Sequence, residues 1–80
     1  MNLELCQAVD VMKELSEDAT LPKNVKQKLT VILELLENSG DISMKVSKAI
    51  HEIEELVDDK NLQAYSRTQL YNVIGFLESM

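Results

Sequence analysis

Apolar residues recur every three or four positions along four segments of this chain, and that spacing is the strongest constraint on its fold. At 3.6 residues per turn such a spacing gathers apolar side chains on one face of an α-helix, whereas a strand alternates at every second residue. No segment alternates for long enough to predict a strand. The predicted fold class is therefore all-α, with apolar stripes at Leu5, Ala8, Val9, Met12 and Leu15; Val25, Leu29, Ile32, Leu33 and Leu36; Ile42, Val46, Ala49, Ile50, Ile53 and Leu56; and Leu70, Val73, Ile74 and Leu77.

The ends of the helices are marked by a few residues with special backbone or capping properties. The first helix is expected over about residues 3–17, and Pro22 begins the second because proline is tolerated in the first turn of a helix. Gly40 can supply the left-handed residue that follows a helix, near Asn38-Ser39. Asp41 or Ser43 is expected to cap the third helix, and Asn61 to cap the fourth.

The two halves of the chain resemble each other without any gap. Sliding residues 43–80 onto residues 2–39 at an offset of 41 gives 8 identities in 38 positions. Helical periodicity alone aligns some leucines, but it does not explain why acidic residues before the turns also match. We predict a duplicated helical hairpin, and a four-helix up-and-down bundle in which the two hairpins cover each other. The identities are Ala8/Ala49, Glu14/Glu55, Leu15/Leu56, Asp18/Asp59, Leu21/Leu62, Leu29/Leu70, Leu36/Leu77 and Glu37/Glu78.

Length and charge limit what such a bundle can do. Eighty residues with 45% apolar content predict a single domain over residues 1–80. A net charge of −6 repels phosphate and anionic lipid, which argues against a nucleic-acid or membrane-surface role. One cysteine, no signal-peptide pattern and no long apolar run lead us to expect a cytoplasmic protein without a membrane segment.

Three blocks of the sequence resemble a family of small archaeal proteins known only as uncharacterised. They are Glu14–Lys26, with its Leu-Pro-Lys-Asn stretch, Ser66–Val73 and Leu77–Glu78. The resemblance spans essentially the whole chain and implies a short four-helix bundle, with no activity, substrate or cofactor attached. Relatives often carry a second proline where this chain has Gln63, so we expect its fourth helix to begin less sharply.

No catalytic, cofactor-binding or metal-binding residue is predicted. His51 and Glu55 stand at i and i+4 and could share a metal, but we expect them to form a contact on a solvated acidic face instead. Cys6 lies one turn before Asp10, where a nearby carboxylate disfavours a reactive thiolate, so a partly buried structural thiol is expected. Ser66 is not accompanied by a glycine-rich loop or a second basic cluster.

A candidate basic patch consists of Lys23, Lys26, Lys28 and Arg67. It could meet an acidic partner or RNA phosphate despite the negative total. The alternative, which we favour, is that Lys26 and Arg67 pair with acids such as Asp18 or Asp59 across the turns and lock each hairpin.

A candidate partner surface consists of Tyr71, Phe76 and Met80 on the fourth helix, with or without a contribution from Leu3. Apolar residues lie around much of this helix, which predicts burial on more than one side. The leading hypothesis is a non-enzymatic interaction or assembly module that binds a protein partner or forms a homodimer. The alternative is a nucleic-acid-associated accessory protein that uses the basic patch.

Overall fold

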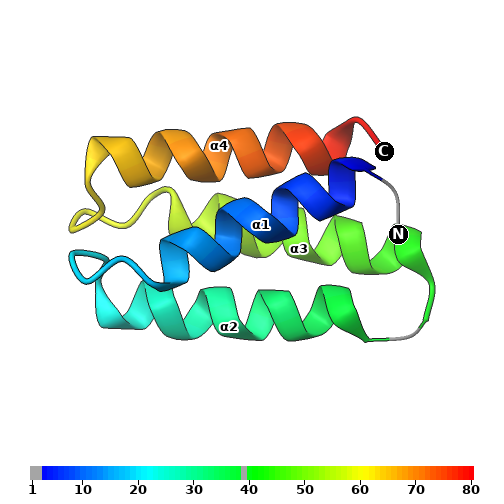
Figure 1. Cartoon of the computed structure of the whole chain (residues 1–80), viewed down its shortest axis with the longest axis horizontal. Coiled ribbons are helices and arrows are strands. Elements are labelled where there is room, and N and C mark those ends of the chain that lie inside the picture. The colour runs from blue at the N-terminus through cyan, green and yellow to red at the C-terminus, as the bar shows by residue number, and fades with distance from the viewer. Residues whose placement is uncertain (1–2, 39) are drawn as a thin grey trace.

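Four antiparallel α-helices make up the computed structural model, which describes residues 3–38 and 40–80 (Figure 1). They are α1 (Leu3–Ser16), α2 (Lys23–Glu37), α3 (Ile42–Leu56) and α4 (Ala64–Glu78), and the described residues contain no strand. The predicted all-α four-helix fold is confirmed. Met1, Asn2 and Ser39 lie outside the described residues, and with them the two ends of the first predicted repeat.

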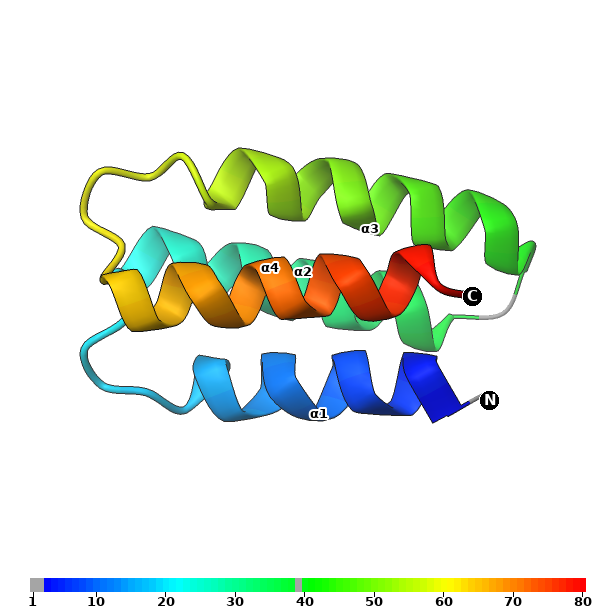
Figure 2. The ribbon, with the colours of Figure 1, turned by 90° about the horizontal axis from the view of Figure 1, so that it is seen from above.

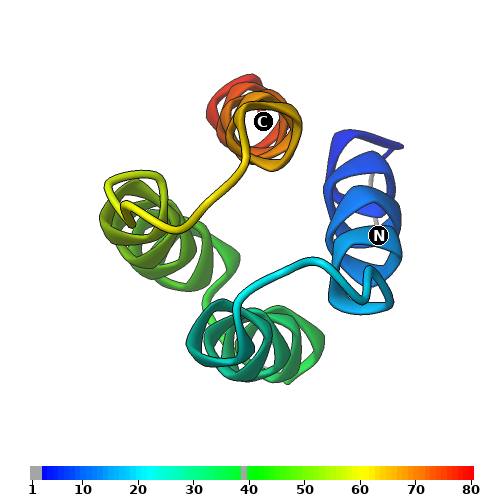
Figure 3. The same ribbon diagram turned by 90° about the vertical axis from the view of Figure 1, so that its left-hand side faces the viewer.

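The helices stand at the corners of a square when the bundle is viewed along its length (Figure 3). Each helix neighbours the next one in the chain, and α4 returns to lie beside α1. The closest packing is between α1 and α4, and then between α2 and α3, so each predicted hairpin packs more closely on the other hairpin than internally. The two hairpin turns share one end of the bundle, and the α2–α3 connection shares the other with both termini (Figure 2).

The core runs along the centre of the bundle and receives side chains from every helix. Met12, Leu29, Ile53 and Leu70, one from each helix in order, have no exposed surface. The stripes predicted from apolar spacing supply most of this core because a helix can bury one face only by packing it against its neighbours. The remaining buried apolar residues are Leu5, Ala8, Val9, Leu15, Leu21, Val25, Ile32, Leu36, Ala49, Leu56, Val57, Leu62, Val73, Ile74 and Leu77.

The two hairpin turns are built in the same way. Asp18 accepts a 2.8 Å hydrogen bond on Oδ1 from the backbone N–H of Thr20, and Asp59 accepts one of 2.8 Å from the backbone N–H of Asn61. An aspartate that bonds the backbone two residues ahead stabilises a turn, which gives a physical reason for acids at both positions. The division of residues 1–80 into repeats 2–39 and 43–80 stays a prediction about the origin of the chain.

The start of α3 agrees with the sequence prediction. Asp41 is its N-cap, with its carboxylate accepting a 2.9 Å hydrogen bond from the backbone N–H of Ser43. Gly40 has a φ of +135°, a conformation that side chains resist, but it lies in the connection rather than directly after α2. The extended residue Asn38 ends α2, and Pro22 stands at the N-cap of that helix.

The predicted cap of α4 at Asn61 is wrong. The N-cap is Gln63, whose side chain makes no capping hydrogen bond. The backbone N–H of Asn61 instead donates a hydrogen bond to Asp59, so Asn61 belongs to the turn before the helix. Helix α4 therefore begins without a side-chain cap.

Candidate partner-binding surface

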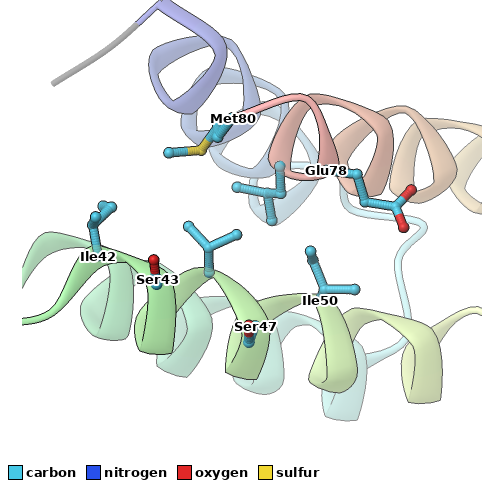
Figure 4. Close-up of a pocket in the computed structure, with 8 residues that line it drawn as sticks. Ile42, Ser43, Ser47, Ile50, Glu78 and Met80 are labelled. Atoms are coloured by element: carbon cyan, nitrogen blue, oxygen red, sulfur yellow. The ribbon is translucent and has the colours of Figure 1, made fainter.

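A groove of about 400 Å³ lies between the first half of α3 and the end of α4 (Figure 4). Ile42 and Ile50 project from α3 toward α4, Met80 reaches down from the chain after α4, and Glu78 lies at the rim. Its apolar floor and sparse polar rim are typical of a binding surface. Eight residues line it: Ile42, Ser43, Val46, Ser47, Ile50, Leu77, Glu78 and Met80.

The groove exists because α3 is less well covered than its counterpart α1. At the offset of 41, Val46 and Ile50 of α3 correspond to Leu5 and Val9 of α1. Leu5 is 3% and Val9 6% exposed, whereas Val46 and Ile50 are only partly buried. The same apolar stripe is therefore buried in the first half of the chain and partly open in the second.

An acidic residue continues, on each helix, the face that lines the groove. Glu54 lies seven residues after Ser47, so it continues the same face of α3 for two more turns. On α4, Tyr71 precedes Glu78 by seven residues and extends that face in the other direction. Glu54, Tyr71 and Glu78 are all exposed, and within the described ranges neither glutamate is within ion-pair distance of a basic side chain.

Gly75 lies on the same face of α4, four residues after Tyr71 and three before Glu78. A Cβ placed on it meets no atom within 4 Å. Glycine inside a helix costs about 0.5–1 kcal/mol relative to alanine, and no close approach within the described chain requires it here. The position is open to a molecule outside this chain.

We expect Gly75→Ala to raise the free energy of unfolding by about 0.5–1 kcal/mol, because alanine restricts the unfolded chain and meets no obstacle in the folded one. Urea denaturation followed by circular dichroism measures the change. Gly40→Ala is the matched control and should destabilise, since its φ of +135° strains any side chain. A loss of stability in Gly75→Ala would show that the space is occupied in the folded protein.

The three residues predicted as a partner surface do not share one face. Tyr71 is exposed on the groove side of α4, and Met80 lines the groove itself. Five residues separate Tyr71 from Phe76, which is about 140° around a helix, and Phe76 is partly buried against the core. Tyr71 and Met80 therefore belong to the groove surface and Phe76 does not.

Exposed apolar residues also gather at the end of the bundle that carries the groove. Leu3 is 69% and Met44 71% exposed at the starts of α1 and α3, and Ile42 and Met80 belong to the same end of the bundle (Figure 2). The sequence reading missed the contribution of α3, because Ile42, Val46 and Ile50 read as ordinary core residues. The small polar residues Ser43 and Ser47 on the flank of this stripe are the only sequence signal that separates it from that of α1.

The candidate basic patch is divided among different roles. Lys28 forms a 2.9 Å ion pair between its Nζ and Oε2 of Glu52 on α3. Arg67 turns inward to backbone carbonyls, while Lys23 is exposed and Lys26 is partly buried. Two of the four cations are thus engaged within the chain, which weakens the case for a phosphate-binding surface.

Arg67 holds the second hairpin turn, although through carbonyls rather than through the carboxylate that the pairing hypothesis named. Its Nε donates a 2.9 Å hydrogen bond to the carbonyl of Val57, and one terminal nitrogen donates to those of Asp59 at 3.2 Å and Leu62 at 3.3 Å. A cation at the end of α3 satisfies carbonyls that the helix leaves unpaired and favours its negative end. Lys45 does the same for α2, donating to the carbonyls of Leu36 and Asn38.

The turn carboxylates are held in their charged form. The hydroxyl and backbone N–H of Thr20 lower the pKa of Asp18 below its usual value, with the charge of Lys26 adding to the effect. The side-chain amide of Asn24, 2.9 Å away, does most to lower the pKa of Asp59, followed by the N–H of Asn61 and the charge of Arg67. The Asn24–Asp59 bond also joins the start of α2 to the α3–α4 turn.

The ion pair between α2 and α3 shifts both of its members. Hydrogen bonding and charge from Lys28 lower the pKa of Glu52, and Glu52 in turn raises the pKa of Lys28. Groups with depressed pKa values stabilise the fold above their unfolded pKa, and this stability is lost as the pH falls through the folded value. The contribution of Lys28 is present below its unfolded pKa and is lost as the pH rises through its raised value.

We therefore expect the midpoint of thermal unfolding to fall as the pH is lowered from about 5 to about 3, where Asp18, Asp59 and Glu52 take up protons. Calorimetry at a series of pH values measures it. Glu52→Gln should make the acid slope shallower, because one of the three depressed carboxylates is then absent. An unfolding midpoint that stays constant over this range in the unmodified chain would contradict the assignment.

His51, Cys6 and Ser66 lie on three different helices. His51 Nε2 lies 3.4 Å from Glu55 Oε1 with both side chains exposed, which confirms the predicted contact on a solvated face. Cys6 is a free, half-buried thiol on α1, and Ser66 is buried in α4. Within residues 3–38 and 40–80, no three His, Cys, Asp or Glu side chains come together as a metal site would require.

No helix among the described residues has the length and apolar character needed to cross a membrane. Taken together, the fold and the groove define a small helical-bundle protein with an apolar groove between α3 and α4. The profile of the Uncharacterised protein family (UPF0147) matches residues 2–80, and the chain belongs to that family. The family carries no assigned function, which agrees with the resemblance seen in the sequence.

Individual members of the family are similar to this chain over most of its length. A UPF0147 protein of Thermococcus kodakarensis is 33% identical over 76 residues, covering 92% of each chain. One from Thermoplasma acidophilum is 30% identical over 71 residues, covering 88% of this chain and 81% of its own. A crystal structure of a protein of this family from Thermoplasma acidophilum superimposes with a TM-score of 0.90 at 27% identity, covering 95% of this chain and 91% of that one.

Proposed function

We propose that this protein is a non-enzymatic interaction module of the cytoplasm that binds a protein partner in the α3–α4 groove. The single observation that carries the proposal is the incomplete burial of Val46 and Ile50 on α3, whose counterparts on α1 are buried. Val46 and Ile50 are only partly buried and Ile42 is 44% exposed, in a groove that Met80 closes from α4. Contiguous exposed apolar surface of this kind marks sites of protein association.

The chemistry of the groove supports binding rather than catalysis. Of the eight residues that line it, Glu78 alone is charged, and two serines are the only other polar side chains. The groove lining contains no nucleophile–base pair. Cys6 lies on α1, and the His51 imidazole contacts Glu55 outside the groove. An apolar floor with few polar groups gives affinity by excluding water.

The basic patch does not gain comparable support. Lys28 is paired with Glu52, and Arg67 bonds three carbonyls of the α3–α4 turn. Nucleic-acid binding needs several cations free to replace counterions along a phosphate backbone. The described contacts therefore support protein binding more than nucleic-acid binding.

Co-purification with matched variants tests it. Ile42→Gln/Met80→Gln removes two exposed apolar side chains from the groove without adding charge, and Val31→Gln removes one that is 58% exposed on α2. Each tagged chain is expressed in cells that encode it, and captured proteins are identified by mass spectrometry. Circular dichroism checks that all variants remain folded.

We expect at least one protein to be captured by both the unmodified chain and Val31→Gln and to be lost from the groove variant. Capture that survives Ile42→Gln/Met80→Gln but is lost in Val31→Gln would assign the interaction to another face. The absence of any captured protein, including a second copy of the chain, would overturn the proposal.

A further inference from the structure

We infer that the occupant of the α3–α4 groove is a short, basic, amphipathic helix of a partner protein, an inference that rests on the function proposed above. Three features of the groove define this occupant separately: its place between two antiparallel helices, the length of the exposed face, and the sign of the charges along its rim.

The occupant is a helix because the groove is an apolar trough between two antiparallel helices. Val46 and Ile50 of α3 line one wall and are only partly buried, whereas their counterparts Leu5 and Val9 on α1 are buried. A helix laid along the trough would bury Val46 and Ile50 as their counterparts are buried. Docking an amphipathic helix by its apolar face into such a groove is a common mode of recognition.

The length of the groove suits three to four turns of helix. The groove-lining residues of α3 run from Ile42 to Ile50, and the same face continues to Glu54, twelve residue steps from Ile42 or about 18 Å at 1.5 Å each. On α4 the opposing edge runs from Tyr71 to Met80, with Gly75 between them. Because nothing lies near the Cβ position of Gly75, a partner backbone can come closer to α4 there than a side chain would allow.

The charge of the rim selects a basic partner. Glu54 on α3 and Glu78 on α4 flank the apolar floor, both are exposed, and none of the eight residues that line the groove is basic. Lys45 caps α2 and Arg67 caps α3, while Lys48 and His51 lie on the outer flank of α3, outside the groove lining. With a net charge of −6 behind them, the two glutamates favour lysine or arginine on the exposed flanks of the docked helix.

A second copy of the chain fits the groove less well. Its own groove carries the same two glutamates, so a symmetric contact through this face brings like charges together. Each copy also adds a net charge of −6, which opposes association. A homodimer through the groove is therefore an outcome that would contradict the inference.

Three synthetic peptides of about 14 residues test the occupant. The first has leucines at i, i+4, i+7 and i+11 with lysines elsewhere, the second keeps the leucines and replaces lysine by glutamate, and the third is a scramble of the first. Binding to the full 80-residue chain is measured by fluorescence anisotropy at low and moderate salt. Light scattering of the chain alone reports its mass.

We expect the basic peptide to bind about tenfold more tightly than its acidic twin at low ionic strength, and the preference to shrink as salt is added. Glu54→Gln/Glu78→Gln should remove most of that preference, and Ile42→Gln/Met80→Gln should weaken binding of the basic peptide about tenfold or more. Val31→Gln should leave both unchanged. The variants alter exposed side chains, so all of them should fold.

The inference is overturned by equal binding of the basic peptide and its scramble, by equal or tighter binding of the acidic twin, by the absence of any binding, or by a dimer that Ile42→Gln/Met80→Gln dissociates. These results leave the proposed function standing when a partner is still captured in a groove-dependent way. The proposed function fails separately if no groove-dependent partner is captured in cells.

Discussion

Replacing Leu70 with alanine is expected to lower the free energy of unfolding by about 2–5 kcal/mol. Leu70 lies in the middle of α4 with none of its surface exposed, and its repeat counterpart Leu29 is equally buried on α2. Truncation removes apolar contacts and leaves a cavity that rigid helices close only in part. A domain of this size has only several kcal/mol of stability, so the loss is a large share of the total.

Urea denaturation at neutral pH measures the change, with Leu3→Ala as the matched control. Leu3 is 69% exposed at the start of α1, so the same substitution there should alter stability by less than about 0.5 kcal/mol. Leu29→Ala should resemble Leu70→Ala. If Leu70→Ala and Leu3→Ala had equal effects, Leu70 could not lie in the core of the folded chain.

Replacing Arg67 with alanine is expected to lower the free energy of unfolding by about 1–3 kcal/mol. Its guanidinium donates hydrogen bonds to the carbonyls of Val57, Asp59 and Leu62, which hold the end of α3 and the turn that follows. Without the guanidinium these partly buried carbonyls lose their donor, and α3 loses a favourable charge at its negative end.

Arg67→Lys separates the charge from the geometry. A lysine keeps the charge but lacks the planar fork of donors that reaches carbonyls on both sides of the turn, so it should recover less than half of the loss. Lys23→Ala, at an exposed cation on α2, is the control and should change stability by less than about 0.5 kcal/mol. Full recovery in Arg67→Lys would mean that charge alone matters, and no loss in Arg67→Ala would exclude the role in the turn.

The fold could be predicted from local patterns because helices reveal their buried faces in the sequence. The stripes at three- and four-residue spacing locate all four helices, and Asp41 caps α3 as expected. The matching acids Asp18 and Asp59 pointed to equivalent turns, which the hydrogen bonds of those turns now show. Helix α4 begins later than expected, at Ala64, because the backbone N–H of Asn61 donates a hydrogen bond to Asp59 in the preceding turn.

The candidate site was much harder to predict from the sequence. Ile42, Val46 and Ile50 have the spacing of any core stripe, and nothing in that spacing reports that they are incompletely buried. Apolar residues around α4 suggested a surface there, but its members Tyr71 and Phe76 proved to lie on different sides of the helix. The Arg67 side chain was expected to meet a carboxylate, whereas the carbonyls at the end of α3 lie within its reach.

What the sequence by itself determined is thus the set of helices, their apolar faces and the residues of the turns, since each follows from contacts within a few positions along the chain. The tertiary structure alone decided which faces are covered. Burial depends on how closely neighbouring side chains approach, and Val46 and Ile50 of α3 stay partly open toward α4 while Leu5 and Val9, their counterparts on α1, are buried. The groove between them is therefore a property of packing between helices.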